Sequence, residues 1–262
     1  MRSGGLRPVS PLLGRIDAYC DAVPRSGARV EELGPLRLFV AEGVPWPYYA
    51  RPAGGDLTAA DVRAMRARQW ALGVPEAFEW IAELAPALSS AAREAGLAVR
   101  EVPLMALEQP PEAPAVDAAV RRLDAHDPAL AEARAVADVA FGARGASARD
   151  WPERRLGAVR DRMAAGLTVT VVAEDAGRVV AVGSHQPVGA VTEVVGVGTL
   201  PAARRRGLAA AVTAALVADA RRRGAGLVFL SAGDEDVARV YGRLGFTRVG
   251  TAALAAPAGV SS

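Results

Sequence analysis

The chain of 262 residues has one cysteine, no lysine, few aromatic residues and no long apolar segment. Cys20 alone can form neither an internal disulfide nor a thiolate metal site. The two histidines, His126 and His185, have no cluster of acidic residues beside them, so we expect no bound metal. No apolar run approaches the roughly 20 residues that a membrane-spanning helix needs, and we expect no membrane partner.

The lack of a long apolar segment and the scarcity of aromatic residues also bear on where the protein is located in the cell and on whether it binds nucleic acid. Arg15 and Asp17 interrupt the only stretch near the N-terminus that could serve as the core of a signal peptide, which predicts a cytoplasmic protein. All 31 basic residues are arginine, yet the net charge is only +2. A nucleic-acid-binding protein typically shows a basic stripe interleaved with aromatic residues. We therefore expect no nucleic-acid partner.

Proline-rich sequence divides the chain into two predicted lobes, 1–110 and 116–262. Residues 109–115 read QPPEAPA, and three prolines in so short a span oppose both helix and central strand. In the first lobe the patterns predict helices over 11–22, from Thr58 onward and over 76–95, the last divided at Pro86. They predict strands over 37–41, 46–49 and 97–107.

The second lobe has a clearer alternation of elements. After an entry strand over 116–123, helices are expected over 128–141 and 152–165, then strands over 167–173, 178–182 and 193–199. A long helix from Arg204, a strand over 227–230, a helix over 235–244 and a strand over 246–254 complete it. This order predicts a mixed α/β (α+β) fold, with helices on both faces of the sheet.

One loop of the second lobe is suited to a pyrophosphate. The sequence from Val197 reads VGTLPAARRRGLA. This pattern predicts the end of a strand, then a short loop rich in arginine and glycine, and then the start of a helix. Such a turn presents free backbone N–H groups and the positive end of a helix dipole to one point. Gly207 permits close approach of the backbone, and the arginines add charge-assisted hydrogen bonds. No P-loop or dinucleotide-binding glycine pattern competes with this reading.

Two motifs in order resemble the acyl-CoA-binding signature of GNAT acetyltransferases. Arg204-x-x-Gly207-x-Ala209 is similar to the central cofactor motif, and Tyr241-Gly-Arg-Leu-Gly245-Phe246 is similar to the second hallmark, Tyr-x-x-x-Gly-Phe. The resemblance extends from about Ala129 to Leu254. It implies a mixed, mostly antiparallel sheet flanked by helices, and an enzyme that transfers an acetyl group from acetyl-CoA to an amine. The first lobe could be a degenerate GNAT-like lobe, although it lacks the arginine–glycine loop.

The resemblance also implies residue roles. Tyr241 would protonate the leaving thiolate, and Glu193, at the start of the strand before the loop, would take the proton of the amine. Asp234 stands where many members have an asparagine, which puts one cofactor contact in doubt. The backbone of the strand end would pair with the pantetheine arm, and the loop would hold the pyrophosphate. The implied cofactor-binding residues are Val197, Gly198, Thr199, Arg204, Arg205, Arg206, Gly207, Leu208 and Ala209.

Several alternatives stay open at this point. His185 follows a predicted strand and competes with Glu193 for the role of base. Five aromatic residues of the first lobe either fill a core or line an acceptor pocket: Trp46, Tyr48, Tyr49, Phe78 and Trp80. The acceptor is a small-molecule amine or a peptide, and the oligomeric state is open, with a homodimer among the assemblies allowed. Two other functions compete with the acetyltransferase reading. The first is a catalytically inactive CoA-binding regulatory module. The second is an arginine-rich nucleic-acid-binding protein, which is less compatible with the near-neutral net charge.

Overall fold

The computed structural model describes residues 10–107, 109–143 and 145–259. The first nine residues, which belong to the segment examined for a signal peptide, lie outside the described residues, as does Glu108 beside the predicted linker. Within the described ranges no helix has both the length and the apolar character required to cross a membrane. Nor do these ranges contain a group of three or more His, Cys, Asp or Glu residues placed to hold a metal ion.

The chain forms two compact units, and strands β5 (Ala98–Leu107) and β11 (Thr247–Ala256) belong in part to each. Unit 1 comprises Met1–Glu42, Trp46–Leu104 and Val249–Ser262, and unit 2 comprises Gly43–Pro45 and Met105–Arg248. Each unit is a set of residues that contact one another more than they contact the rest of the chain. Such units do not test whether the lobes 1–110 and 116–262 are separate domains, and that division stays a prediction.

In unit 1 a sheet is covered by helices that contribute to an apolar core. Strands β1 and β2, β2 and β3, and β4 and β11 pair antiparallel, whereas β3 and β4 pair parallel. The core holds Leu38 of β2, Phe78 and Trp80 of β4, Met65 of α2 and Leu88 of α3, all buried. The elements in which this unit takes part are α1 (Pro11–Ala22), β1 (Ala28–Leu33), β2 (Leu36–Ala41), β3 (Ala50–Pro52), α2 (Ala59–Leu72), β4 (Phe78–Ile81), α3 (Pro86–Glu94), β5 (Ala98–Leu107) and β11 (Thr247–Ala256).

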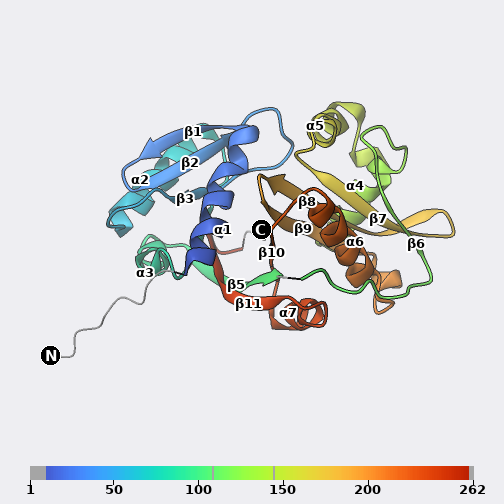
Figure 1. The fold of residues 1–262 in the computed structure, drawn as a ribbon. Coiled ribbons are helices and arrows are strands. Elements are labelled where there is room, and N and C mark those ends of the chain that lie inside the picture. Colours follow the sequence, from blue (N-terminus) through green and yellow to red (C-terminus); the bar gives the residue numbers. More distant parts are fainter. Residues whose placement is uncertain (1–9, 108, 144, 260–262) are drawn as a thin grey trace. The chain divides into compact units, whose positions relative to one another are not determined.

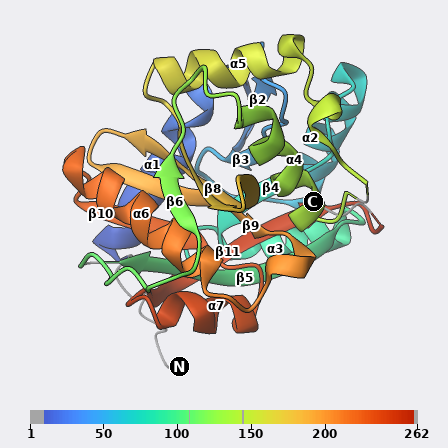
Figure 2. The ribbon, with the colours of Figure 1, turned by 90° about the vertical axis from the view of Figure 1, so that its right-hand side faces the viewer.

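Unit 2 carries strands in the order β10-β9-β8-β7-β6, and Figure 1 shows α6 in front of this sheet. Neighbouring strands pair antiparallel except β9 and β10, which are parallel. Its elements, seen from another side in Figure 2, are β6 (Ala119–Arg122), α4 (Leu130–Ala140), α5 (Glu153–Ala164), β7 (Val169–Asp175), β8 (Arg178–Val188), β9 (Val191–Thr199), α6 (Leu208–Arg222), β10 (Leu227–Ser231) and α7 (Glu235–Gly242).

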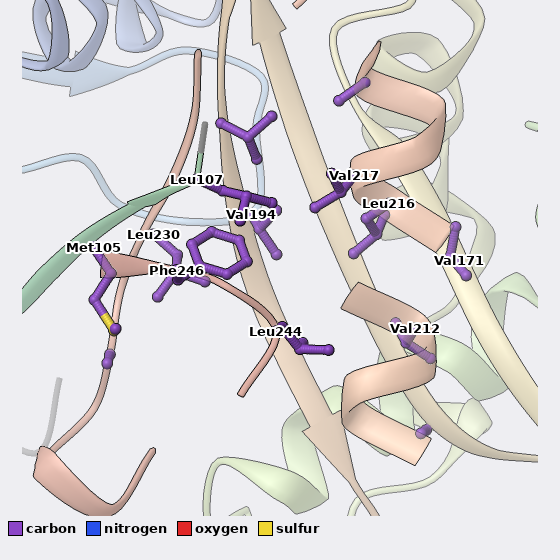
Figure 3. Close-up of a cluster of buried hydrophobic side chains, with 14 of the residues drawn as sticks. Met105, Leu107, Val171, Val194, Val212, Leu216, Val217, Leu230, Leu244 and Phe246 are labelled. Atoms are coloured by element: carbon purple, nitrogen blue, oxygen red, sulfur yellow. The ribbon is translucent and has the colours of Figure 1, made fainter. Parts of the chain in front are cut away.

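Two glycines show that α6 and α4 cover opposite faces of this sheet. A Cβ on Gly183 of β8 would lie 3.0 Å from side-chain atoms of Leu216 and Val212 in α6, and 3.1 Å from Val197 of β9. Val197 therefore faces α6. The next residue, Gly198, faces the other side, where a Cβ would lie 2.5 Å from that of Ala140 in α4. Figure 3 shows the core on the α6 face, where side chains of α6 meet those of the strands.

The predicted fold class, a mixed and mostly antiparallel sheet flanked by helices, is confirmed, but two local predictions are wrong and one strand was missed. Residues 78–81 form strand β4 rather than helix, because they pair with residues 252–255 of β11, far away in the sequence. Pro86 begins α3 and so marks the true helix start. Residues 46–49 are not a strand, since β3 begins at Ala50. The charged edge strand β1 was not predicted at all.

Candidate functional site

The arginine–glycine loop has the backbone conformation of an anion-binding turn. After a short 3-10 turn over Pro201–Ala203, Arg205 and Gly207 take positive φ angles of 63° and 75°. Helix α6 begins at Leu208, and its first backbone bond runs from the Ala211 N–H to the Gly207 carbonyl at 3.0 Å. The N–H groups that precede Ala211 in the helix therefore have no acceptor within α6, which leaves them available to an anion.

The three arginines of the loop have different tasks in the structure. Arg206 is held by an ion pair with Asp175 at 2.6 Å, and it also donates to the Asp117 carbonyl at 3.1 Å. Arg204 donates through Nε to the Thr199 carbonyl at 3.4 Å. For Arg205, no ion pair or side-chain hydrogen bond is found with any residue that the structure describes. Arg206 thus fixes the loop, and Arg205 is the guanidinium most available to a ligand.

Strand β9 is paired along its whole length on one edge but only at its start on the other. Its pairing with β8 extends from Val191 to Thr199. Its parallel pairing with β10 ends at the rung between Glu193 and Phe229. In the part of the chain that the structure describes, β9 therefore has a free backbone edge after Glu193. We refer to this opening between β9 and β10 as the fork.

A β-bulge lies on β9 within the fork. Ser184 pairs with Val195 and Val182 pairs with Gly198, so two residues of β9 oppose one residue of β8. The first of the two is Gly196, with φ at 61°, as in the bulge type that begins with a left-handed glycine. The bulge turns the free edge of β9 just before the arginine–glycine loop.

The three predicted strand residues play different parts. Val197 packs toward α6, and Gly198 has no side chain because α4 lies directly against it. The Thr199 hydroxyl is buried and has no hydrogen-bond partner among the described residues. A buried polar atom without a partner is costly, so this hydroxyl at the end of the fork is a candidate ligand contact.

Tyr241 is connected to the first turn of α6. Burial raises its pKa to about 12, and a side-chain hydrogen bond with Thr213 acts in the opposite direction. Thr213 in turn donates to the Ala209 carbonyl at 2.8 Å. The Tyr241 ring also packs edge-on against Phe246, with ring centroids 5.8 Å apart. At neutral pH the phenol is therefore protonated and able to donate a proton.

Glu193 lies at the base of the fork. It is half-buried, and its register partners are Gln186 on β8 and Phe229 on β10. Its neighbours Thr192 and Val194 face α6, so alternation along the strand directs the Glu193 side chain to the opposite face. Glu193 of β9 and Tyr241 of α7 both belong to unit 2.

His185 does not follow a strand, as the sequence predicted, but lies inside strand β8. It is fully buried at 0% exposure, with Nδ1 3.0 Å from the Thr192 hydroxyl and Nε2 3.1 Å from Asp219 of α6. Arg223 donates to the same carboxylate at 2.5 Å. Since a carboxylate only accepts, Nε2 carries the ring proton and Nδ1 accepts from Thr192. His185 is therefore a structural connection between β9 and α6, whereas Glu193 is half-buried on the other face of the sheet.

This buried pair predicts a pH dependence of stability. Burial lowers the pKa of His185 below its usual 6.5, although the hydrogen bond to Asp219 opposes this. Below about pH 6.5 the unfolded chain therefore binds a proton that the folded chain excludes, and stability falls by up to about 1.4 kcal/mol per pH unit. The charged groups that face His185 and Asp219 are Arg122 of β6, Arg222 of α6 and Arg223, which follows α6.

Urea unfolding at about pH 7 and about pH 5.5 measures this effect. The native protein should lose stability between the two, and His185→Gln, although less stable, should lose much less. The exposed His126 provides the control, because His126→Gln should keep the native pH dependence. Equal pH dependence in native protein and His185→Gln would contradict the burial account.

Asp234, which stands at an expected asparagine, has a clear local role. Its side chain accepts a hydrogen bond from the Val237 N–H at 2.8 Å and so caps α7. A carboxylate at a helix N-terminus is favourable, and no ligand contact is required to explain it.

Sequence reasoning missed Thr192, Thr213 and Asp219, which orient the predicted site residues. Asp219 lies in a helix whose apolar face is otherwise regular, and a single buried acid on such a face was the available signal. Thr192 and Thr213 carry no signal, because a threonine in a strand or a helix is common.

Comparison with known proteins gives a consistent result. Residues 137–246 match the model of the acetyltransferase (GNAT) family. A GCN5-related N-acetyltransferase from Kribbella flavida is 25% identical with a TM-score of 0.71, and the match covers 96% of this chain and 98% of that chain.

Two further solved structures share the fold. A GNAT-family protein from Novosphingobium aromaticivorans is 22% identical with a TM-score of 0.54, covering 90% of this chain and 93% of that one. A tandem GNAT protein from the clavulanic acid biosynthesis pathway is 17% identical with a TM-score of 0.54, covering 87% and 79%. No curated protein matches the chain.

Proposed function

We propose that the chain, whose residues 137–246 match the model of the acetyltransferase (GNAT) family, is an acyltransferase that transfers an acetyl group from acetyl-CoA to an amine. The acceptor is a small molecule or a peptide, and the amine attacks the thioester directly. The observation that carries this proposal is the fork, which leads from Glu193 along a free strand edge to an anion-binding loop.

The residues present fit acetyl-CoA. The free edge of β9 offers backbone groups, those of Val197 and Thr199 among them, to the amides of the pantetheine arm, as an added strand would use them. The N–H groups from Arg205 to Ala209 and the Arg205 guanidinium fit a pyrophosphate, whereas the Arg204 N–H already donates to the Pro201 carbonyl at 3.4 Å. The buried Thr199 hydroxyl would gain a partner. The thioester then lies toward the base of the fork.

Two side chains would move the protons. The amine nitrogen forms a bond to the thioester carbonyl carbon, and Glu193 takes the proton that the amine loses, directly or through water. The carbon–sulfur bond then breaks, and Tyr241 protonates the departing thiolate. Glu193 and Tyr241 belong to different sides of the fork, the face opposite α6 and the α6 face, so acid and base need not compete for one position.

The first experiment is thiol release from acetyl-CoA with a panel of amines, amino acids and peptides. We expect turnover with at least one amine. Binding of acetyl-CoA without turnover of any acceptor would favour the inactive CoA-binding module instead, an alternative that the acetyltransferase matches weigh against. No binding and no turnover would contradict the proposal.

When an amine that the enzyme accepts is used as the substrate, Glu193→Gln should lower kcat by about 10²-fold near neutral pH. The defect should shrink at higher pH, where the amine loses its proton to water, and the affinity for acetyl-CoA should change little. Glu101→Gln, an exposed glutamate of unit 1, is the matched control. A native kcat in Glu193→Gln over the whole pH range would contradict the role of base.

A further inference from the structure

Phe141, at the end of α4, is an exposed aromatic residue in a chain that has only five phenylalanines. Its side chain is 68% exposed, although its backbone is fixed by a hydrogen bond from its N–H to the Ala137 carbonyl at 3.0 Å. An exposed aromatic ring on a fixed backbone is a candidate ligand contact when it borders a binding site.

The course of α4 brings Phe141 to the fork. Near its start, Glu132 of α4 pairs with Arg178 of β8 at 2.6 Å. At its end, Ala140 lies against Gly198 of β9, where a Cβ would meet the Ala140 Cβ at 2.5 Å and the Phe141 ring at 3.8 Å. The helix therefore crosses the sheet from β8 to β9. Strand β8 occupies one edge of β9, so the direction in which α4 runs, from β8 to β9, leads on to the free edge of β9. Phe141 follows the last residue of α4 and therefore lies toward that edge.

Gly198 makes this close approach possible. Any side chain there would push α4, and Phe141 with it, away from the strand. The glycine at this position thus serves the packing of α4, rather than only a contact with the cofactor.

We propose that Phe141 packs its ring against the pantetheine arm of the acyl-CoA and so holds that arm on β9. This inference depends on the proposed function, because it places the arm along the free edge of β9. The arm contains methylene and methyl groups between its amides, and burying these against an exposed ring is favourable. The amides would bind the strand backbone, and the ring would cover the apolar part from the α4 side.

The test compares two ligands by calorimetry. Coenzyme A contains the arm, whereas adenosine 3′-phosphate 5′-diphosphate contains its nucleotide and phosphates without the arm. Phe141→Ala should weaken CoA binding by about tenfold, and Phe141→Leu should restore part of the affinity. Neither variant should change the affinity for the nucleotide. Trp70→Ala, which removes a 78% exposed aromatic residue of unit 1, is the matched control and should leave both affinities unchanged.

The outcomes separate this inference from the proposed function. Native affinity for CoA in Phe141→Ala, with binding in the native protein intact, would overturn the role of Phe141 alone. Equal weakening of CoA and nucleotide would also overturn it, because the ring would then act on the loop rather than on the arm. A change of oligomeric state in Phe141→Ala without a change in CoA affinity would assign the ring to an interface between copies. Failure of the native protein to bind CoA would instead contradict the proposed function.

Discussion

Gly207→Glu should abolish the binding of acetyl-CoA, with a loss of affinity of at least about 100-fold. The glycine lies at the start of α6 with φ at 75°, so a side chain there is strained. A Cβ would also approach Val116 at 3.4 Å. The added carboxylate would stand beside the N–H groups proposed to bind the pyrophosphate, and two like charges at that distance repel each other. Calorimetric titration with acetyl-CoA measures the loss.

Two further variants separate the contributions to this effect. Gly207→Ala introduces the strain and little bulk, and should retain part of the affinity. Gly73→Glu, at a glycine of unit 1 with φ at 65°, introduces the same substitution in a similar backbone conformation away from the loop. It should lower stability without affecting affinity. Native affinity in a folded Gly207→Glu protein would show that the loop does not hold the pyrophosphate.

Tyr241→Phe should lower kcat by about 10²-fold and leave the KM for acetyl-CoA nearly unchanged. Only the hydroxyl is removed, so the packing of the ring against Phe246 is kept. With a pKa of about 12, the native tyrosine stays protonated throughout the range in which activity is measured. Its loss should therefore lower kcat equally at every pH below about 10.

Tyr49→Phe is the matched control, because burial also raises the pKa of Tyr49 but the residue belongs to unit 1. That variant should keep the native kcat. A rise in KM without a fall in kcat for Tyr241→Phe would assign the hydroxyl to cofactor binding, through Thr213 and the first turn of α6, and not to proton transfer.

The part of the fold that could be predicted is the part governed by local signals. Proline and glycine residues marked the ends of most helices, and α2 begins directly after Thr58, close to the predicted start, with Asp61 completing a capping box. The prediction for residues 78–81 was wrong because these four residues of β4 are extended only through their pairing with β11. No local sequence pattern encodes that pairing. The burial of His185 was not predicted for a similar reason, because its partner Asp219 is 34 residues away in the sequence.

The candidate site shows the same limit. The arginine–glycine loop and Tyr241 could be recognised from contiguous motifs. The end of the β9–β10 pairing at Glu193 and Phe229 depends on register, and the contact of Ala140 with Gly198 depends on packing. The sequence therefore predicts the chemistry of the loop, but it does not show that a free strand edge leads to it.

The most direct test of this account is a crystal structure of the protein with coenzyme A. The account predicts the pantetheine arm along the free edge of β9, beside Val197 and Thr199, with the pyrophosphate on the N–H groups between Arg204 and Ala209. Coenzyme A bound elsewhere, as in the cavity of about 640 Å³ that Glu132, Val136 and Val180 help to line, with the fork left empty, would contradict it.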